Sequence, residues 1–217
     1  MIALIVARGG SKRLPGKNIK LFNGLPLICW TISAAQKSEL FDHIIVSTDN
    51  AEIAKISEAY GATVPFLRPA VLASDKAEML DVVLHATDFL NFSGKIALLQ
   101  PTSPLRNERH ILEAFELMNN SGRKVVSFTK VAQSLDWLYY QEPKSPHLRL
   151  VKDDQGSPSI PFDRVSKTVL IPNGAIYMLE AINLRTSGKF IDNQTEPYLM
   201  DREDSIDLDT QSDWDFG

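Results

Sequence analysis

The sequence lacks the features that would tie it to an oxidising compartment, a membrane or a nucleic acid. It contains one cysteine, Cys29, which cannot form an internal disulfide and lies among apolar residues, so we expect a buried thiol in a reducing compartment. No apolar run approaches the ~20 residues that a membrane-spanning helix needs, and the chain opens into an apolar run rather than a basic leader. A net charge of −4 argues against a general nucleic-acid binder. These absences favour a cytoplasmic globular protein with no membrane or nucleic-acid partner.

Acidic residues are also missing from the first part of the chain, because none precedes Glu39. The cations left there without a local counter-charge are Arg8, Lys12, Arg13, Lys17, Lys20 and Lys37. Acids gather instead at the other end, where residues 201–215 hold seven acids and one base. Charge runs are often only solvated faces. The alternative is a site in which cations and a carboxylate-held metal bind the same phosphates.

An apolar run at residues 2–7 ends abruptly in a loop rich in glycine and cations. The run is short and continuous with no helical period, which predicts a buried strand. Glycines such as Gly9 and Gly10 let the main chain approach a ligand closely, and exposed N–H groups can cradle phosphate oxygens. The loop is not a Walker A motif, because five residues separate Gly10 from Gly16 and Asn18 replaces the hydroxyl residue, and the dinucleotide fingerprint is absent. We interpret it as a polyphosphate site, with a basic surface loop as the alternative.

Apolar strands and amphipathic helices alternate through residues 1–128. We expect strands over residues 2–7, 43–47, 63–67, 95–99 and 124–128, and helices over 27–37, 51–60, 76–92 and 108–119. This pattern predicts an α/β fold, with a mostly parallel sheet covered by helices on both faces. Ligands in such folds bind beyond the carboxyl ends of the strands. Polar loops follow those ends at residues 8–17, 47–49, 68–75 and 100–106, so we expect a single site there.

Residues 129–171 break this alternation and predict an inserted excursion of extended ribbons. The chain then divides into an α/β domain, residues 1–128 and 172–217, and the insertion, residues 129–171. After it we expect a strand over 172–178, a helix over 179–185, a strand over 198–200 and a final helix from residue 210. In the last segment, Asp207 and Asp209 point to the same side if the chain is extended. Two such carboxylates suit Mg²⁺ or Mn²⁺, although Asp209 is also placed to cap the final helix.

Several of these segments resemble the motifs of the acylneuraminate cytidylyltransferase family, the CMP-sialic acid synthetases. They are, in order, residues 7–18, 46–49, 67–70, 99–106, 172–177 and 204–210. The match covers nearly the whole chain except the excursion. It implies a nucleotide-diphospho-sugar transferase-like, Rossmann-like fold. It also implies transfer of CMP from CTP to the anomeric hydroxyl group of a nonulosonic acid, with release of pyrophosphate, in a homodimer whose excursions exchange between subunits.

The resemblance also implies roles for individual residues, carried over position by position. The triphosphate and ribose of CTP would be bound by Arg8, Ser11, Lys12, Lys17 and Asn18. The cytosine would be approached by Arg68 and by Ser74 with its neighbours in the loop of residues 73–75. The sugar acid would be contacted by Gln100 and by the partner subunit's Arg164. Asp207 and Asp209 would hold Mg²⁺ or Mn²⁺, and Lys17 and Asp209 would be the catalytic residues.

Other functions stay open at this point. A Kdo cytidylyltransferase shares a similar opening loop, although the block at residues 173–177 favours a nonulosonic acid. A sugar-1-phosphate nucleotidylyltransferase also begins with a glycine-rich basic loop, and an inactive nucleotide-binding module is a third possibility. Ile171 stands where sialate-activating relatives often carry arginine. Legionaminic acid or another bacterial nonulosonic acid is therefore an open alternative to N-acetylneuraminic acid.

Overall fold

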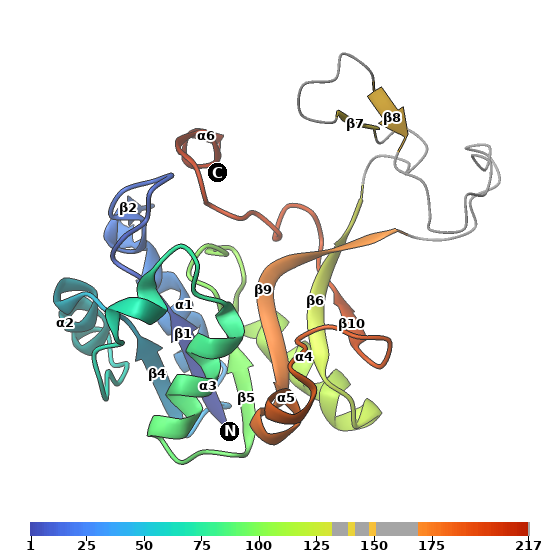
Figure 1. Ribbon diagram of the computed structural model, residues 1–217, viewed down its shortest axis with the longest axis horizontal. Helices are drawn as coiled ribbons and strands as arrows, with labels where there is room; N and C mark the ends of the chain where they lie inside the picture. Colours follow the sequence, from blue (N-terminus) through green and yellow to red (C-terminus); the bar gives the residue numbers. More distant parts are fainter. Residues whose placement is uncertain (132–138, 142–147, 151–168, 217) are drawn as a thin grey trace.

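The computed structural model describes residues 1–131, 139–141, 148–150 and 169–216, which are organised around a six-stranded sheet (Figure 1). The strand order is β10-β6-β9-β5-β1-β4. Five strands run parallel: β1 (Ile2–Val6), β4 (His43–Ser47), β5 (Lys95–Leu98), β6 (Val125–Lys130) and β10 (Glu196–Leu199). The long strand β9 (Leu170–Glu180) runs antiparallel between β5 and β6. The expected mostly parallel sheet is confirmed.

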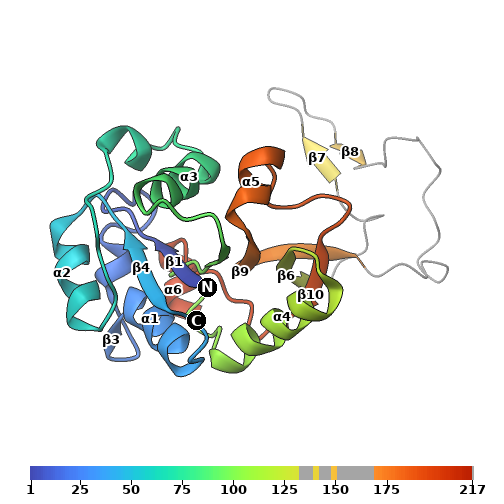
Figure 2. The same ribbon diagram turned by 90° about the horizontal axis from the view of Figure 1, so that it is seen from below.

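Helices cover both faces of this sheet (Figure 2). One face carries α1 (Leu27–Lys37), α2 (Ala51–Ala59) and α4 (Glu108–Ser121), and the other carries α3 (Met79–Phe89) and α5 (Ala181–Ser187). Side chains alternate along a strand, so Ala3 and Ile5 of β1 join the first apolar core while Ile2 and Leu4 join the second. Because both faces are buried, the strands read as continuous apolar runs.

A smaller apolar cluster brings the two ends of the chain together. Phe22 lies in the hairpin of β2 (Leu21–Phe22) and β3 (Leu25–Pro26), and it packs with the completely buried Leu208. The ring of Phe22 also meets Trp214 of α6 (Gln211–Phe216) edge to face, with centroids 5.7 Å apart. This contact places α6 beside the hairpin that follows the opening loop (Figure 1).

The expected strand over residues 63–67 was wrong. Thr63 and Leu67 each make a single parallel bridge, to Ile45 and Thr48 respectively. Pro65 lies between them and has no N–H group to donate, so the ladder is interrupted. The other expected elements are present, with ends shifted by at most three residues. Two short 3₁₀ helices, η1 (Lys17–Ile19) and η2 (Ala70–Ala73), lie in the polar loops and were not anticipated.

The expected insertion lies between the long ends of β6 and β9, whose pairing continues to Lys130 and Leu170. Within it, β7 (Tyr139–Gln141) and β8 (Leu148–Leu150) pair antiparallel. Arg164 lies outside the described residues, as does most of this segment. The dimeric role of the insertion therefore stays a prediction. Among the described helices, none is long and apolar enough to cross a membrane.

Candidate active site

The loops at the carboxyl ends of β1 and β5, together with the loop after residue 67, surround a cavity of about 530 Å³. Nine residues predicted from the sequence line it: Arg8, Ser11, Lys12, Lys17, Asn18, Arg68, Ser74, Gln100 and Asp209. Asp207 lines an adjoining recess of about 450 Å³, and Gln100 borders both. Three of the four expected polar loops therefore converge here, and the fourth, residues 47–49, lines neither cavity but supports the opening loop through Asp49.

Another cavity, of about 540 Å³, lies at the opposite edge of the sheet, beside the C-terminal ends of α4 and α5. Two of its three lysines are engaged within the fold. Lys95 Nζ is 3.0 Å from Asn119 Oδ1, and Lys124 Nζ is 2.6 Å from Asp192 Oδ2. Cations there also offset the partial negative charge of two helix C-termini. We therefore place the candidate site in the cavity where the motif residues converge.

The opening loop is held in shape by polar contacts of its own backbone. The N–H group of Gly9 donates to Asp49 Oδ1 at 2.9 Å, and a Cβ atom at Gly9 would lie 2.9 Å from Asn50, so only glycine fits. Asn18 is buried and its Nδ2 donates to the carbonyl oxygen of Arg8 at 2.9 Å. Gly16 has a positive φ of 66° and precedes η1 directly. This bend starts η1 at Lys17.

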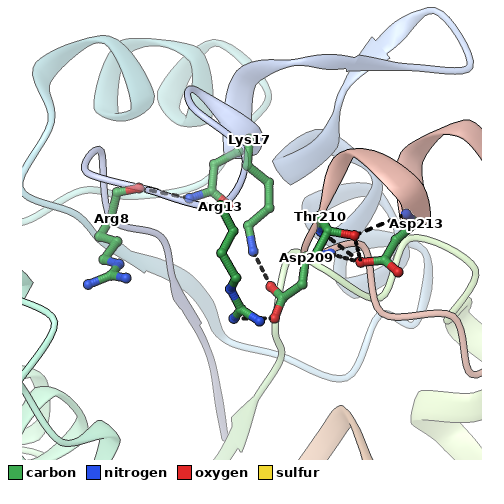
Figure 3. A network of polar contacts seen from close by, with 7 residues as sticks. Arg8, Arg13, Lys17, Asp209, Thr210 and Asp213 are labelled. Carbon is green, nitrogen blue, oxygen red and sulfur yellow. Dashed lines mark hydrogen bonds and ion pairs between the residues drawn. The ribbon is translucent and has the colours of Figure 1, made fainter.

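Asp209 pairs with two cations of this loop. Lys17 Nζ lies 2.5 Å from its Oδ1 and Arg13 Nη2 lies 2.5 Å from its Oδ2. Figure 3 shows both side chains directed at the carboxylate. The Lys17 side chain is 13% exposed and that of Arg13 is 69% exposed. Because an exposed ion pair contributes little, the contact with Lys17 is the stronger of the two.

A second carboxylate, Asp75, pairs with the remaining cations of the loop. Arg8 Nη1 lies 3.0 Å from Asp75 Oδ1, and Lys12 Nζ lies 2.5 Å from Oδ2. The hydrogen bond from Lys12 and the charges of both cations lower the pKa of Asp75. Two carboxylates, Asp75 and Asp209, therefore pair with all four cations of the opening loop.

The carboxylate of Asp209 is available for these contacts because Thr210, with Asp213, caps the start of α6. Asp213 Oδ2 accepts from the N–H group of Thr210 at 2.7 Å, and the Thr210 hydroxyl oxygen accepts from the N–H group of Asp213 at 3.2 Å. This is a reciprocal cap of the kind found at helix starts. The alternative in which Asp209 serves as the cap is wrong. Just before it, the N–H group of Leu208 donates to the carbonyl oxygen of Thr102 at 2.8 Å.

Asp207 and Asp209 provide oxygen ligands but do not form a complete metal cage. Partial desolvation of its carboxyl group and the charge of Asp209 raise the pKa of Asp207, although the residue is exposed overall, while a hydrogen bond from Thr102 lowers it. A nearby divalent cation would relieve this repulsion. Within the described residues, no three His, Cys, Asp or Glu side chains converge. The pair fits a hard cation that shares its coordination with substrate phosphates.

Arg68 brings a buried cation to the cavity. Its backbone N–H group donates to the carbonyl oxygen of Thr48 at 2.7 Å, and its side-chain Nη2 lies 3.9 Å from Asp49 Oδ1. Burial lowers its pKa, whereas the charge of Asp49 raises it. Its Nε and Nη1 have no hydrogen-bond partner among the described residues. An unsatisfied buried donor is costly, so a ligand acceptor at this point would be stabilising.

Sequence reasoning missed several residues that shape the site. Arg106 is completely buried, and its Nη2 donates to the Thr31 hydroxyl oxygen at 2.6 Å and to the carbonyl oxygen of Gln100 at 3.4 Å. It thereby fixes the backbone of Gln100. Arg13 was not assigned a role of its own, and Asp75 was expected only as part of the loop near the cytosine. Arg106 is the last residue of the motif at residues 99–106, and this position was the signal that could have identified it. No sequence pattern pointed to the partners of Asp75.

Comparisons with known proteins agree on one family. The cytidylyltransferase family model matches residues 2–148. The chain is 35% identical to the CMP-N,N′-diacetyllegionaminic acid synthase of Legionella pneumophila subsp. pneumophila, with 99% of this chain and 93% of that protein covered. It is 34% identical to the N-acylneuraminate cytidylyltransferase of Escherichia coli O18:K1:H7, where 99% of this chain spans 50% of the longer protein.

A solved structure shares the fold. The chain superposes on a CMP:2-keto-3-deoxy-manno-octonic acid synthetase complexed with CTP, with a TM-score of 0.69, covering 97% of this chain and 93% of that one. The two sequences are 15% identical. This likeness concerns the arrangement of the sheet and helices alone.

Proposed function

The chain belongs to the cytidylyltransferase family, and we propose that it transfers CMP from CTP to the anomeric hydroxyl group of a nonulosonic acid, releasing pyrophosphate. Relatives named for legionaminic and acylneuraminic acids match nearly the whole chain, which supports this substrate class. We assign the reaction to the cavity lined by the opening loop and the C-terminal acidic segment.

One observation carries the assignment of the site. Lys17 and Asp209 are 192 residues apart in sequence, yet their charged groups lie 2.5 Å apart. A cation that meets phosphate and a carboxylate that meets a metal ion are needed at one point when a nucleoside triphosphate is bound with its ion. The contact supports a shared site formed by the basic beginning and the acidic end of the chain.

The chemistry requires positioning and charge neutralisation rather than a protein nucleophile. The hydroxyl group on the anomeric carbon of the sugar acid attacks the α-phosphorus of CTP, forms a new P–O bond and releases its proton to the solvent. The bond from the α-phosphorus to the oxygen that bridges to the β-phosphorus breaks, and pyrophosphate leaves with the electron pair. We assign Lys17 to the leaving phosphates, where its charge offsets the negative charge that develops. We assign Asp209 to the side of the attacking hydroxyl group.

Binding of substrate requires an exchange of partners at Asp209. Lys17 and Arg13 each engage one of its two carboxylate oxygens. We assign Asp207 and Asp209 as the ligands of Mg²⁺ or Mn²⁺. When the ion is bound, the side chains of Lys17 and Arg13 would contact the phosphates instead of Asp209. A bound ion supplies polarisation of the α-phosphate and a lower pKa for the attacking hydroxyl group.

The other residues take the roles that the family resemblance gave them. Arg8, Ser11, Lys12 and Asn18 are assigned to the triphosphate and ribose, and Arg68 and Ser74 to the cytosine. Arg68 has the strongest support, because its buried donors are unsatisfied among the described residues.

The adjoining recess, which Gln100 shares with the main cavity, is assigned to the sugar acid. Ile171 lines this recess and is 52% exposed, so an apolar side chain faces part of the sugar. We keep the partner subunit's Arg164 as the group for the sugar carboxylate, within a homodimer that works in the cytoplasm. Gel filtration with light scattering tests this, because an active monomer would exclude a partner's residue from the site.

A matrix of nucleotides and sugars tests the proposed function. Pyrophosphate release is measured with CTP, UTP, GTP and ATP, each with N-acetylneuraminic acid, a legionaminic acid, Kdo and a sugar 1-phosphate. We expect release with CTP and a nonulosonic acid. Asp209→Asn should lower the rate by about two orders of magnitude or more, as loss of a charge-stabilising group does. Asp215→Asn is the matched control, since it removes one charge from the same acidic segment and contacts Gln211 instead.

The matrix also separates the alternatives. Turnover with Kdo alone would reassign the enzyme to the eight-carbon acid. Turnover that requires a sugar 1-phosphate would contradict the proposal. Tight CTP binding without turnover with any sugar would favour an inactive nucleotide-binding module.

A further inference from the structure

His110, in the first turn of α4, connects that helix to the segment that carries the metal-binding carboxylates. The residue is buried, with 2% of its surface exposed. Its ring Nδ1 accepts from the backbone N–H group of Asn107 at 3.2 Å. The backbone N–H group of His110 donates to Asn107 Oδ1 at 3.3 Å. These bonds close a capping box. On the other edge of the ring, Nε2 lies 3.3 Å from Asp204 Oδ2.

The contacts fix which ring nitrogen carries the proton. A neutral imidazole has one donor and one acceptor, and Nδ1 must be the acceptor because it faces an N–H group. The proton therefore lies on Nε2, which faces the Asp204 carboxylate. Arg109 Nη2 is also 3.2 Å from Nε2, but this side chain is 64% exposed and lies 3.6 Å from Glu113. Because Nδ1 accepts, the ring is neutral, and its Nε2–H group faces Asp204. Burial lowers the pKa of His110, which acts in the same direction.

Asp204 begins the segment that contains Asp207 and Asp209, and two further anchors follow it. The Ser205 hydroxyl oxygen accepts from Asn173 Nδ2 at 2.9 Å, and the N–H group of Leu208 donates to the carbonyl oxygen of Thr102 at 2.8 Å. The three anchors join the segment to α4, to β9 and to the loop after β5. The anchors at Asp204 and Ser205 both precede the two carboxylates through side chains, but of the three only the anchor at Asp204 joins the segment to α4. Without it, none of these anchors holds the first turn of the segment against α4.

We propose that His110 is a positioning residue that holds Asp204 and thereby sets where Asp207 and Asp209 lie relative to the phosphate-binding loop. The inference rests on the proposed function, because it matters only if these carboxylates hold a divalent ion. Groups that support metal ligands typically change metal affinity by about 10- to 100-fold. His110 acts one step further away, through Asp204, so we expect about a three- to tenfold effect on Mn²⁺ affinity.

Two substitutions at His110 separate positioning from helix capping. In His110→Asn, the shorter amide can still accept from the N–H group of Asn107 but cannot reach Asp204. In His110→Gln, the longer amide can still donate to Asp204 but leaves the Asn107 N–H group unpaired. Asn107→Ala is the matched control, because it removes the capping oxygen and keeps the backbone N–H group that holds the ring.

The measurement is the Mn²⁺ dissociation constant, obtained from the electron paramagnetic resonance of free Mn²⁺ with CTP present and no sugar. We expect His110→Asn to raise it about three- to tenfold. His110→Gln and Asn107→Ala should stay within about twofold of wild type while lowering the melting temperature. Asp204→Ala should match His110→Asn, and the double variant should add nothing further. Asp204 is 32% exposed, so this variant provides the test even where His110→Asn fails to fold.

The outcomes distinguish this inference from the proposed function. If the wild type binds Mn²⁺ with CTP, and His110→Asn and Asp204→Ala bind it equally well, His110 is only a helix cap and the inference is overturned. If His110→Gln weakens Mn²⁺ binding as much as His110→Asn, capping explains both and the inference is again overturned. If the wild type neither binds Mn²⁺ with CTP nor releases pyrophosphate, the proposed function fails and takes the inference with it.

Discussion

Replacing Lys17 with methionine isolates the contribution of one partly buried charge at the site. The substitution keeps most of the aliphatic stem and removes the ammonium group that lies 2.5 Å from Asp209. A hydrogen bond to a charged group contributes about 1.5–3 kcal/mol. Lys17 must leave Asp209 when it takes a phosphate, so we expect the lower part of this range, about 1.5–2 kcal/mol. At about 1.4 kcal/mol per factor of ten, kcat/KM for CTP should fall roughly 10- to 30-fold.

Arg13 provides a matched control for this variant. It contacts the same carboxylate at the same distance of 2.5 Å, but its side chain is 69% exposed against 13% for Lys17. Exposed ion pairs contribute about 0–1 kcal/mol. Arg13→Met should therefore change kcat/KM by no more than about fivefold.

Steady-state pyrophosphate release at low and high salt separates the two variants. The effect of Arg13→Met should shrink as salt rises, because ions screen exposed charges more than buried ones. The effect of Lys17→Met should persist. Equal losses of kcat/KM in both variants, or a near-normal Lys17→Met enzyme at limiting CTP, would refute the reasoning. Either result would show that burial does not determine how much each contact contributes to kcat/KM.

Three further predictions follow from the charges around the site and from the core. Asp75→Asn frees two loop cations and should tighten CTP binding about two- to fivefold at low salt, measured by calorimetry; weaker binding would mean that Asp75 contacts the ligand. The fold raises the pKa of Asp207 and so favours its protonated form. Without metal, the free energy of unfolding should therefore fall as pH rises through that pKa. Asp207→Asn should then be the more stable protein near pH 7 in EDTA by thermal unfolding, and a less stable variant contradicts this. Burial raises the pKa of Cys29 to about 11, so iodoacetamide at pH 8 should label it only as fast as the protein unfolds; faster labelling would show an accessible thiol.

The fold followed from the sequence because both faces of the sheet are buried. Continuous apolar strands separated by amphipathic helices have few other solutions. The error at residues 63–67 has a local cause, since the apolar residues there surround Pro65, which cannot take part in a ladder. The pattern identified apolar character but not the missing donor.

The site was predictable as a set of loops, but the partners of its side chains were not. The carboxyl ends of parallel strands meet at one edge, which is why residues as distant as Lys17 and Gln100 line one cavity. The approach of Asp209 depends on packing between Phe22, Leu208 and Trp214. These apolar residues show no periodicity across the chain that would reveal their contact. Apart from the family resemblance of residues 204–210, charge complementarity between the two ends of the chain was the signal in the sequence.

The positioning groups were harder still to foresee. His110 falls outside the quoted motifs, and its role depends on which atoms its two ring nitrogens face. Arg106 was visible as the last residue of a motif, yet its burial beneath Gln100 required the fold.

A crystal structure with CTP and Mn²⁺ tests the central claim most directly, because the anomalous signal of manganese locates the ion without assumptions. We expect manganese beside Asp207 and Asp209, and the triphosphate against Lys12 and Lys17. Manganese or CTP bound elsewhere, such as in the cavity beside the C-terminal ends of α4 and α5, would contradict it.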